Sequence, residues 1–337
     1  MNRNVNRNVN RNAFLKGIAA LMLAVAPLAT VAGTAHAAEW DMPTPYPDKT
    51  FHTVNIQQFA DEVREATGGE LDITIHSAGS LIKHPEIKNA VRSGQVPAGE
   101  FFMSLISNEN PVYGLDSQPF LAASYEDAEK LWNAQKPVVT ETLAAQNLVP
   151  LFSVPWPPQG LYTKQEIASV DDMKGLKLRA YNAALEEFAN LAGAAPTQVE
   201  VPDIPQAFST GQVEAMITSP STGANSAAWD YVGVYTPIDA WLPKNVVVVN
   251  KDAFDALDDA TREAVMTAAA AAETRGWEMS RAETDEMTRM LADNGMTIAE
   301  PSAELMEGLR AIGEQMKQSM TESATPEAMT VLEGFGG

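Results

Sequence analysis

Apolar and polar residues follow first a helical and then a strand period near the start of the chain. From residue 53, the segment TVNIQQFADEVREATGG has the spacing of a helix that Gly68-Gly69 ends, with an expected buried face of Val54, Phe59, Val63 and Ala66. ELDITIHS then alternates as a strand, PEIKNAVRSG predicts a second helix, and FFMSLIS is an apolar run. This alternation of helix and strand predicts an α/β fold with a largely parallel sheet.

A nine-residue pattern occurs twice. AVRSGQVPA (90–98) and AFSTGQVEA (207–215) each place a glycine at a helix end, followed by Gln-Val and an expected strand. The repeated junction predicts two similar α/β lobes.

Two proline-containing segments are expected to connect these lobes. VPWPPQG (154–160) cannot be helical, and AWLPKN (240–245) leads into the strand VVVVN. Two crossings imply that each lobe is built from discontinuous segments. The expected lobes are residues 38–156 plus about 245–284, and residues 157–244 plus about 285–337.

A long helical pattern supports this division. It runs from Asp259 to about Asn294, with Asp258 or Asp259 as N-cap and Gly295 at its end. About 35 residues give roughly 50 Å, whereas a 150-residue lobe is about 40 Å across. The helix is therefore expected to lie across both lobes, and Gly276 is the place where it could bend.

The N-terminus has the pattern of a secretory signal peptide. A basic segment containing Arg3, Arg7, Arg11 and Lys16 precedes the apolar run GIAALMLAVAPLATVAG and the motif Ala35-His36-Ala37. We expect residues 1–37 to be removed on export to the periplasm. The alternative, a retained transmembrane helix, is disfavoured because the apolar run is short and ends in a cleavage motif.

Charge and cysteine content narrow the functional classes. Loss of four of the 23 basic residues, against 44 acidic ones, changes the formal charge from −21 to −25. Such a charge disfavours binding to nucleic acid or anionic lipid. The sequence has no cysteine, which excludes disulfides, thiol nucleophiles and cysteine-ligated metals.

Common enzyme signatures are absent from the sequence. It contains no G-x-S-x-G, H-E-x-x-H, G-x-x-x-x-G-K-[ST] or G-x-G-x-x-G motif. His52, His76 and His84 lack metal-ligand spacing and are interpreted as surface or capping residues. The acid pairs Asp171-Asp172 and Asp258-Asp259 are interpreted as helix or turn caps. We therefore expect no catalytic residue, metal or cofactor.

Aromatic residues gather in irregular segments near the expected crossings. A cleft between lobes is where a ligand would bind, so these residues are candidates for its walls. The alternative for each is packing in a core. The candidates are Trp40, Tyr46, Trp156, Tyr162, Trp229 and Trp241.

Arg179 lies at the carboxyl end of an expected strand in GLKLRAYNA (175–183), which alternates through Leu176, Leu178 and Ala180 in this acidic chain. The carboxyl end of a strand is the usual ligand edge of an open α/β sheet. A guanidinium matches a carboxylate with two parallel hydrogen bonds. The alternative is a surface salt bridge, because acidic residues are plentiful.

Several motifs together resemble the DctP-type solute-binding proteins of TRAP (tripartite ATP-independent periplasmic) transporters. SVDDMKGLKLRAYNA (169–183) is the most specific block, and FADEVREATGGELDITIHSAGSL, PEIKNAVRSGQV, DSQPFL and ALDDATREAV extend the resemblance along the mature chain. The resemblance implies two discontinuous α/β lobes, an interlobe cleft and a long helix spanning both lobes. It further implies a monomer that captures a small organic acid anion, closes over it, and delivers it to the small and large subunits of a sodium-driven membrane permease.

The resemblance also implies a ligand site. Arg179 matches the arginine that pairs with the substrate carboxylate, whereas Gln159 stands where some members have a second arginine. In TSPSTGAN, which replaces a frequent acid or amide motif, the ligand-facing residue is Thr218 or Ser219, with Asn225 as a further candidate. The other expected ligand-binding residues are Trp156, Trp241, Asn182, Trp40, Tyr46, Ser104 and Asn245.

A site with one fixed cation favours a monocarboxylate with an apolar or aromatic body over a dicarboxylate or sialic acid. Three alternatives remain open from the sequence. The first is a binding protein of another transport class or of a chemoreceptor system. The others are a hydrolase or lyase that uses a cleft carboxylate, and a metal-binding surface protein.

Overall fold

The computed structural model describes residues 37–336, so the predicted signal peptide lies outside the described residues except for Ala37. The first lobe contains a parallel pair of strands and a three-stranded sheet. Its strands are β1 (Ala38–Pro43), β2 (Leu71–His76), β3 (Ala98–Phe102), β4 (Leu148–Pro155) and β10 (Lys244–Asn250). Its helices are α1 (Phe51–Ala66), α2 (His84–Arg92), η1 (Met103–Ile106), η2 (Pro111–Ser117), α3 (Tyr125–Ala144), α7 (Lys251–Asp255) and α10 (Pro326–Gly336).

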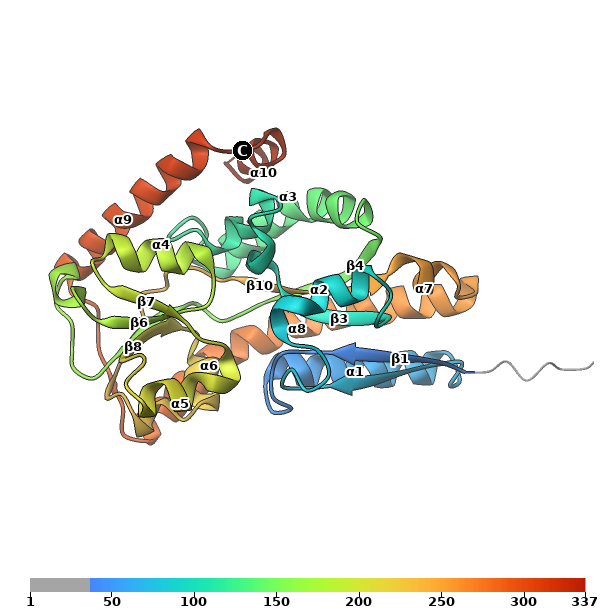
Figure 1. Ribbon diagram of the computed structural model, residues 1–337, viewed down its shortest axis with the longest axis horizontal. Coiled ribbons are helices and arrows are strands. Elements are labelled where there is room, and N and C mark those ends of the chain that lie inside the picture. The colour runs from blue at the N-terminus through green and yellow to red at the C-terminus, as the bar shows by residue number, and fades with distance from the viewer. Residues whose placement is uncertain (1–36, 337) are drawn as a thin grey trace, which may run out of the picture. The chain divides into compact units, whose positions relative to one another are not determined.

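The second lobe is built on a six-stranded sheet (Figure 1). Its strands are β5 (Gly160–Thr163), β6 (Lys177–Ala180), β7 (Ala195–Gln198), β8 (Ala215–Thr218), β9 (Val234–Thr236) and β11 (Thr297–Ile298). Its helices are η3 (Val170–Met173), α4 (Ala183–Leu191), η4 (Val201–Asp203), α5 (Ile204–Ser209), α6 (Pro220–Asn225), η5 (Ala228–Asp230) and α9 (Ala303–Glu322).

Both main sheets are mixed or antiparallel, so the prediction of a largely parallel sheet is wrong. In the first lobe the order is β3-β10-β4, with β10 antiparallel to both neighbours. In the second lobe the order is β11-β9-β5-β8-β6-β7, with β5 antiparallel to β8 and β9. The antiparallel strands β5 and β10 begin at the ends of the two crossings, where the chain enters each sheet.

The two predicted crossings run side by side. The N–H of Trp156 donates to the carbonyl of Pro243 at 2.8 Å, and the N–H of Gln159 donates to the carbonyl of Trp241 at 3.0 Å. The N–H of Ala240 donates to the carbonyl of Gln159 at 3.1 Å. The crossings therefore form one short paired connection between the lobes.

The long helix α8 (Asp259–Asp293) begins and ends as predicted, with Asp258 accepting a hydrogen bond from the N–H of Thr261. It packs against α1 and β4 in the first lobe and against α6 and β11 in the second (orange in Figure 1). Gly276 lies inside this uninterrupted helix. A Cβ atom there would lie 2.4 Å from Val154 Cγ2 and 2.8 Å from Asn55 Nδ2, so the glycine permits close packing.

The repeated junction has the same backbone hydrogen bonds in both copies. Gly94 and Gly211 have φ of +74° and +70°, which favours glycine. The N–H of Gln95 donates to the carbonyl of Ala90 at 2.9 Å, and that of Gln212 donates to Ala207 at 2.9 Å. The nine-residue repeat therefore encodes one helix-to-strand junction used in each lobe.

The predicted buried face of α1 is right for Phe59 and Val63 and wrong for Val54 and Ala66. Val54 is 44% exposed and Ala66 is also exposed, whereas Ile56, Phe59 and Val63 are buried. The buried stripe of α1 follows the spacing of three and four residues from Ile56, and Val54 falls outside it.

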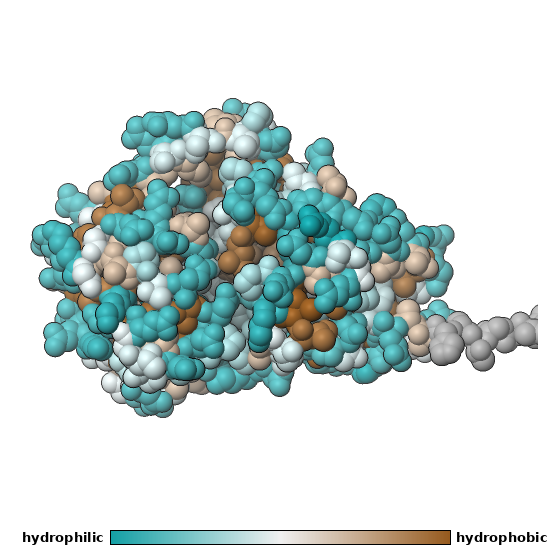
Figure 2. Space-filling model, in the orientation of Figure 1, coloured by the Kyte–Doolittle hydropathy of each residue, from teal (hydrophilic) through white to brown (hydrophobic). Residues whose placement is uncertain are grey.

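The surface is mainly hydrophilic on the face that Figure 2 shows, with apolar residues gathered in small patches near its middle. Among the described residues, no helix combines the length and apolar composition needed to cross a membrane.

Candidate functional site

A pocket of about 400 Å³ lies where strand ends of both lobes meet. The parallel strands β6, β7 and β8 adjoin one another, and each supplies pocket residues at or just after its carboxyl end. In the first lobe, β3 and β4 also end at the pocket. Its walls are Tyr46, His84, Phe102, Trp156, Gln159, Arg179, Tyr181, Glu200, Val201, Thr218, Ser219, Thr222 and Pro243.

Arg179 is the buried cation of this pocket, with 1% of its surface exposed. Its Nε donates to the carbonyl of Val199 at 2.9 Å, and its guanidinium carbon lies 5.1 Å from the ring centre of Tyr181. Within residues 37–336, its buried Nη1 has no hydrogen-bond partner. A buried charged donor without an acceptor is costly, so this atom is available to an anion.

Among residues 37–336, no carboxylate forms a salt bridge with the buried Arg179, so the alternative of a surface salt bridge is not observed. Burial lowers the pKa of Arg179, and the neighbouring Tyr181 and the carboxylate of Glu200 oppose that shift. An incoming carboxylate would supply the pairing that a buried guanidinium needs.

Tyr181 is held in the pocket wall by residues from both crossings. Its hydroxyl donates to Gln159 Oε1 at 2.9 Å and accepts from Trp241 Nε1 at 3.0 Å. Gln159 Nε2 donates to the carbonyl of Pro157 at 2.8 Å. Trp241 is 1% exposed and lies behind Tyr181, so it supports the pocket without lining it.

The first-lobe wall is aromatic and is fixed by buried Asn245. Asn245 Oδ1 accepts from Trp156 Nε1 at 3.1 Å and from the Tyr46 hydroxyl at 3.2 Å, while its Nδ2 donates to Glu100 at 2.7 Å. The rings of Tyr46 and Trp156 meet edge to face with centres 4.9 Å apart. Asn245 therefore orients two wall residues from behind.

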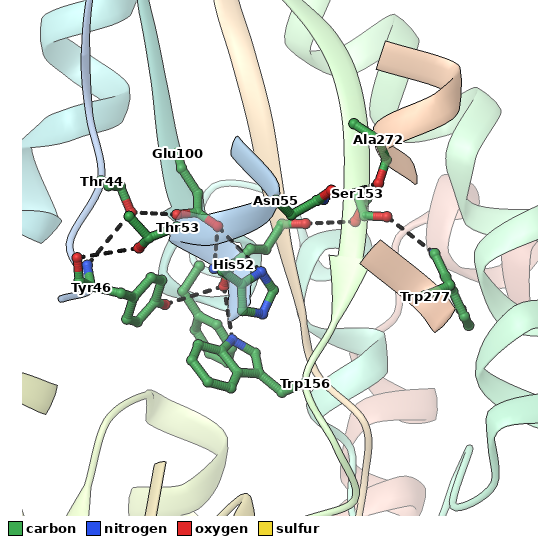
Figure 3. Close-up of polar contacts among 12 residues, drawn as sticks. Thr44, Tyr46, His52, Thr53, Asn55, Glu100, Ser153, Trp156, Ala272 and Trp277 are labelled. Atoms are coloured by element: carbon green, nitrogen blue, oxygen red, sulfur yellow. Dashed lines mark hydrogen bonds and ion pairs between the residues drawn. The ribbon is translucent and has the colours of Figure 1, made fainter. Parts of the chain in front are cut away.

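His52 belongs to the same buried cluster, contrary to its interpretation as a surface or capping residue. Figure 3 shows it beside Trp156 and Glu100, and its Nδ1 lies 3.3 Å from Glu100 Oε1. Burial lowers the pKa of His52, while Glu100 opposes that shift.

Two hydroxyl residues at the start of α6 form another part of the wall. Ser219 caps the helix by accepting from the N–H of Thr222 at 3.0 Å, and its hydroxyl donates to Thr222 Oγ1 at 3.1 Å. Thr218 precedes them at the end of β8.

His84 and Glu200 line the pocket; Glu200 was not identified from the sequence, and the interpretation of His84 as a surface or capping residue is wrong. His84 Nδ1 lies 3.0 Å from Glu200 Oε2, and His84 Nε2 accepts from the backbone N–H of Phe102 at 3.1 Å. The pair joins the two lobes. In the sequence, each residue stands next to an expected strand or helix. Many other residues have such a position, so it did not predict that these two line the pocket.

The structure brings six of the eleven predicted ligand-binding residues to the pocket wall: Arg179, Gln159, Trp156, Thr218, Ser219 and Tyr46. Trp241 and Asn245 support the wall, and Trp40 packs in the core of the first lobe. Asn182 Nδ2 donates to Ser104 Oγ at 2.8 Å, and both residues line a separate cavity of about 730 Å³. The ligand-binding role of all eleven stays a prediction.

Other candidates from the sequence have structural positions. Asn225 lines a cavity of about 450 Å³ that shares Trp156, Val201 and Thr222 with the pocket. Asp172 and Asp258 are caps, as predicted. Among residues 37–336, no cluster of three or more histidines and carboxylates is arranged to hold a metal ion.

Comparison with known proteins places these observations in a family. Residues 44–324 match the family model for bacterial extracellular solute-binding protein, family 7, named DctP. DctP7 of Bordetella pertussis is an extracytoplasmic solute receptor binding pyroglutamic acid. It is 44% identical, its structure superposes with a TM-score of 0.88, and the match covers 89% of this chain and 100% of that chain.

Two further relatives extend the comparison. A marine metagenome TRAP solute-binding protein specific for pyroglutamate is 40% identical, with a TM-score of 0.86 and coverage of 89% of this chain and 99% of that chain. A monocarboxylate 2-oxoacid-binding periplasmic protein of Nostoc sp. is 26% identical over 284 residues, which are 81% of this chain and 76% of that protein. The similar structures confirm the two-lobed α/β fold with a long helix.

Proposed function

The chain belongs to bacterial extracellular solute-binding protein family 7, the DctP family. From this membership and the pocket, we propose the class of ligand that the protein binds. The protein is a TRAP-type solute-binding protein for a small organic acid. The finer proposal is that the acid is a monocarboxylate with a small ring, of which pyroglutamate is the leading candidate. Relatives at 44% and 40% identity bind that lactam.

The proposal rests on one observation: Arg179 is the single buried cation among the described residues that line the pocket. Arg179 offers Nη1 without a partner in the described chain, whereas Gln159 contributes a neutral amide to the pocket lining. One guanidinium can pair with one carboxylate bidentately. A second carboxylate would meet neutral or acidic groups, so a monocarboxylate is favoured.

The remaining walls suit a compact ligand body. Phe102, Trp156 and Tyr181 provide ring surfaces, and Thr218, Ser219 and Thr222 lie among the polar groups. A five-membered lactam has an apolar ring, a carbonyl acceptor and an N–H donor, which these walls can accommodate.

We also propose where the protein acts and what it acts with: it is a periplasmic protein that works with a membrane permease. The N-terminal leader is proposed to be removed after Ala37, which releases a monomeric periplasmic protein. The loaded protein then delivers its ligand to the small and large permease subunits. The proposed lobes are residues 38–156 plus about 245–284, and 157–244 plus about 285–337, except that α10 at the end of the chain packs against α3 of the first lobe.

A ligand screen by thermal unfolding tests this function. We expect pyroglutamate to raise the melting temperature of the mature protein, because ligand at 100 times its dissociation constant adds about 2.7 kcal/mol to stability. Glutarate, glucuronate and benzoate provide the dicarboxylate, sugar-acid and aromatic comparisons. A shift with one of these acids and none with pyroglutamate would contradict the lactam proposal.

A further inference from the structure

A carboxylate lines the pocket that is proposed to hold an anion. Glu200 lies next in the chain to Val199, whose carbonyl accepts from Arg179 Nε at 2.9 Å. Arg179 and Glu200 both line the pocket, so a cation and an anion stand close together in one wall. The carboxylate of Glu200 weakens binding of a simple anion by repulsion. A ligand that binds well beside it is therefore expected to carry a hydrogen-bond donor.

His84 fixes the hydrogen-bonding character of this carboxylate. Because His84 Nε2 accepts from the N–H of Phe102 at 3.1 Å, the ring proton lies on Nδ1. Nδ1 then donates to Glu200 Oε2 at 3.0 Å, and the pair of neutral histidine and carboxylate keeps a net negative charge. Burial raises the pKa of Glu200, but His84 and Arg179 outweigh it and lower the pKa overall.

The other oxygen of Glu200 remains open. Within the described part of the chain, Oε1 has no hydrogen-bond donor, and 34% of the side chain is exposed. A carboxylate can only accept hydrogen bonds. A ligand that fills the pocket must therefore present a donor to Glu200 or leave it desolvated and unpaired, which is unfavourable.

We propose that Glu200, positioned by His84, accepts a hydrogen bond from a donor on the α-carbon of the ligand and so determines specificity. The inference rests on the proposed function of binding a small carboxylate. In pyroglutamate the carboxylate and the ring N–H are attached to the same carbon, which matches adjacent Arg179 and Glu200. 2-Hydroxy acids share this arrangement. 2-Oxoacids present only an acceptor there and are disfavoured.

Replacement of the donor in one ligand tests the inference directly. Calorimetry compares pyroglutamate with its lactone analogue, 5-oxotetrahydrofuran-2-carboxylate, in which oxygen replaces N–H. A site built around a hydrogen bond rejects an analogue that lacks it, so wild-type protein should prefer the lactam by about a hundredfold or more.

Glu200→Gln should remove this preference. His84 Nδ1–H holds the amide oxygen, which turns the amide NH₂ toward the ligand. Lactam affinity should then fall about tenfold to a hundredfold, and the lactone should bind as well as the lactam. Glu166→Gln, at an exposed position after β5, removes the same charge outside the pocket and should preserve wild-type selectivity. An unchanged lactam-to-lactone ratio in folded Glu200→Gln overturns the inference while the proposed function stands.

A second ligand pair separates this inference from the identity of the acid. If wild-type protein binds neither ring compound, the pyroglutamate proposal fails, and lactate is compared with pyruvate. Preference for lactate that is lost in Glu200→Gln supports the role of Glu200. Preference for pyruvate overturns it, and absence of binding to all four acids overturns both proposals.

Discussion

At the residue scale, Arg179 is expected to supply most of the affinity for a carboxylate. Charge-assisted hydrogen bonds contribute about 1.5–3 kcal/mol each, so Arg179→Ala should weaken binding of pyroglutamate about a hundredfold or more. Arg179→Lys should also bind poorly, because an ammonium lacks the planar fork. Calorimetry measures both, with melting temperature as the control for folding. Near-native affinity in Arg179→Ala would assign the arginine a structural role.

Tryptophan fluorescence distinguishes the two aromatic residues of the crossings. Trp156 lines the pocket, whereas Trp241 lies behind Tyr181 and donates its Nε1 proton to the Tyr181 hydroxyl. We expect Trp156→Phe to remove most of any ligand-induced fluorescence change, and Trp241→Phe to retain it. Loss of the signal only in Trp241→Phe would reverse this assignment.

The sequence was informative for residues whose role follows from their own element. Arg179 could be singled out because it lies near the carboxyl end of a strand, which is the ligand edge of such sheets. Glu200 and His84 are 116 residues apart, and their contact depends on how the lobes meet. Trp156 and Trp241 looked equivalent in sequence, since only packing decides which ring faces the pocket.

At the element scale, the packing of α8 predicts the effect of a single methyl group. Gly276→Ala would place Cβ 2.4 Å from Val154 Cγ2, and such overpacking costs about 1–3 kcal/mol, against a helix-propensity gain of about 1 kcal/mol. We expect a lower melting temperature. Gly334→Ala in α10, where the nearest atom is 3.4 Å away, has the same propensity gain without overpacking and should keep or raise the melting temperature. A stabilised Gly276→Ala variant would contradict the close-packing account.

Helices with a clear cap and a regular apolar period were predicted correctly, whereas the directions of the strands in the sheets were not. The limits of α8 follow from its N-cap Asp258 and its helical pattern. Strand direction did not follow from the order of helices and strands, because β5 and β10 enter their sheets from the crossings and run antiparallel. Only the paired geometry of those crossings settles their direction.

At the scale of the whole molecule, ligand binding is expected to close the lobes. The contacts between His84 and Glu200 and between Asn182 and Ser104 join the two lobes around the cavities. Hinge motion about the paired crossings would break them in the open state. Saturating pyroglutamate should therefore reduce the radius of gyration measured by small-angle scattering. An unchanged radius at saturation would argue against closure.

The central position of β10 determines when the protein can fold during its synthesis. Its neighbours β3 and β4 end at Phe102 and Pro155, yet the strand that joins them begins only at Lys244. Until that strand emerges, β3 and β4 have no shared partner, and pairing across such a separation is slow. The sheet of the first lobe therefore cannot be completed before strands β5 to β9 of the second lobe have been made. This order of synthesis keeps the nascent chain open, as suits a protein with an expected export leader.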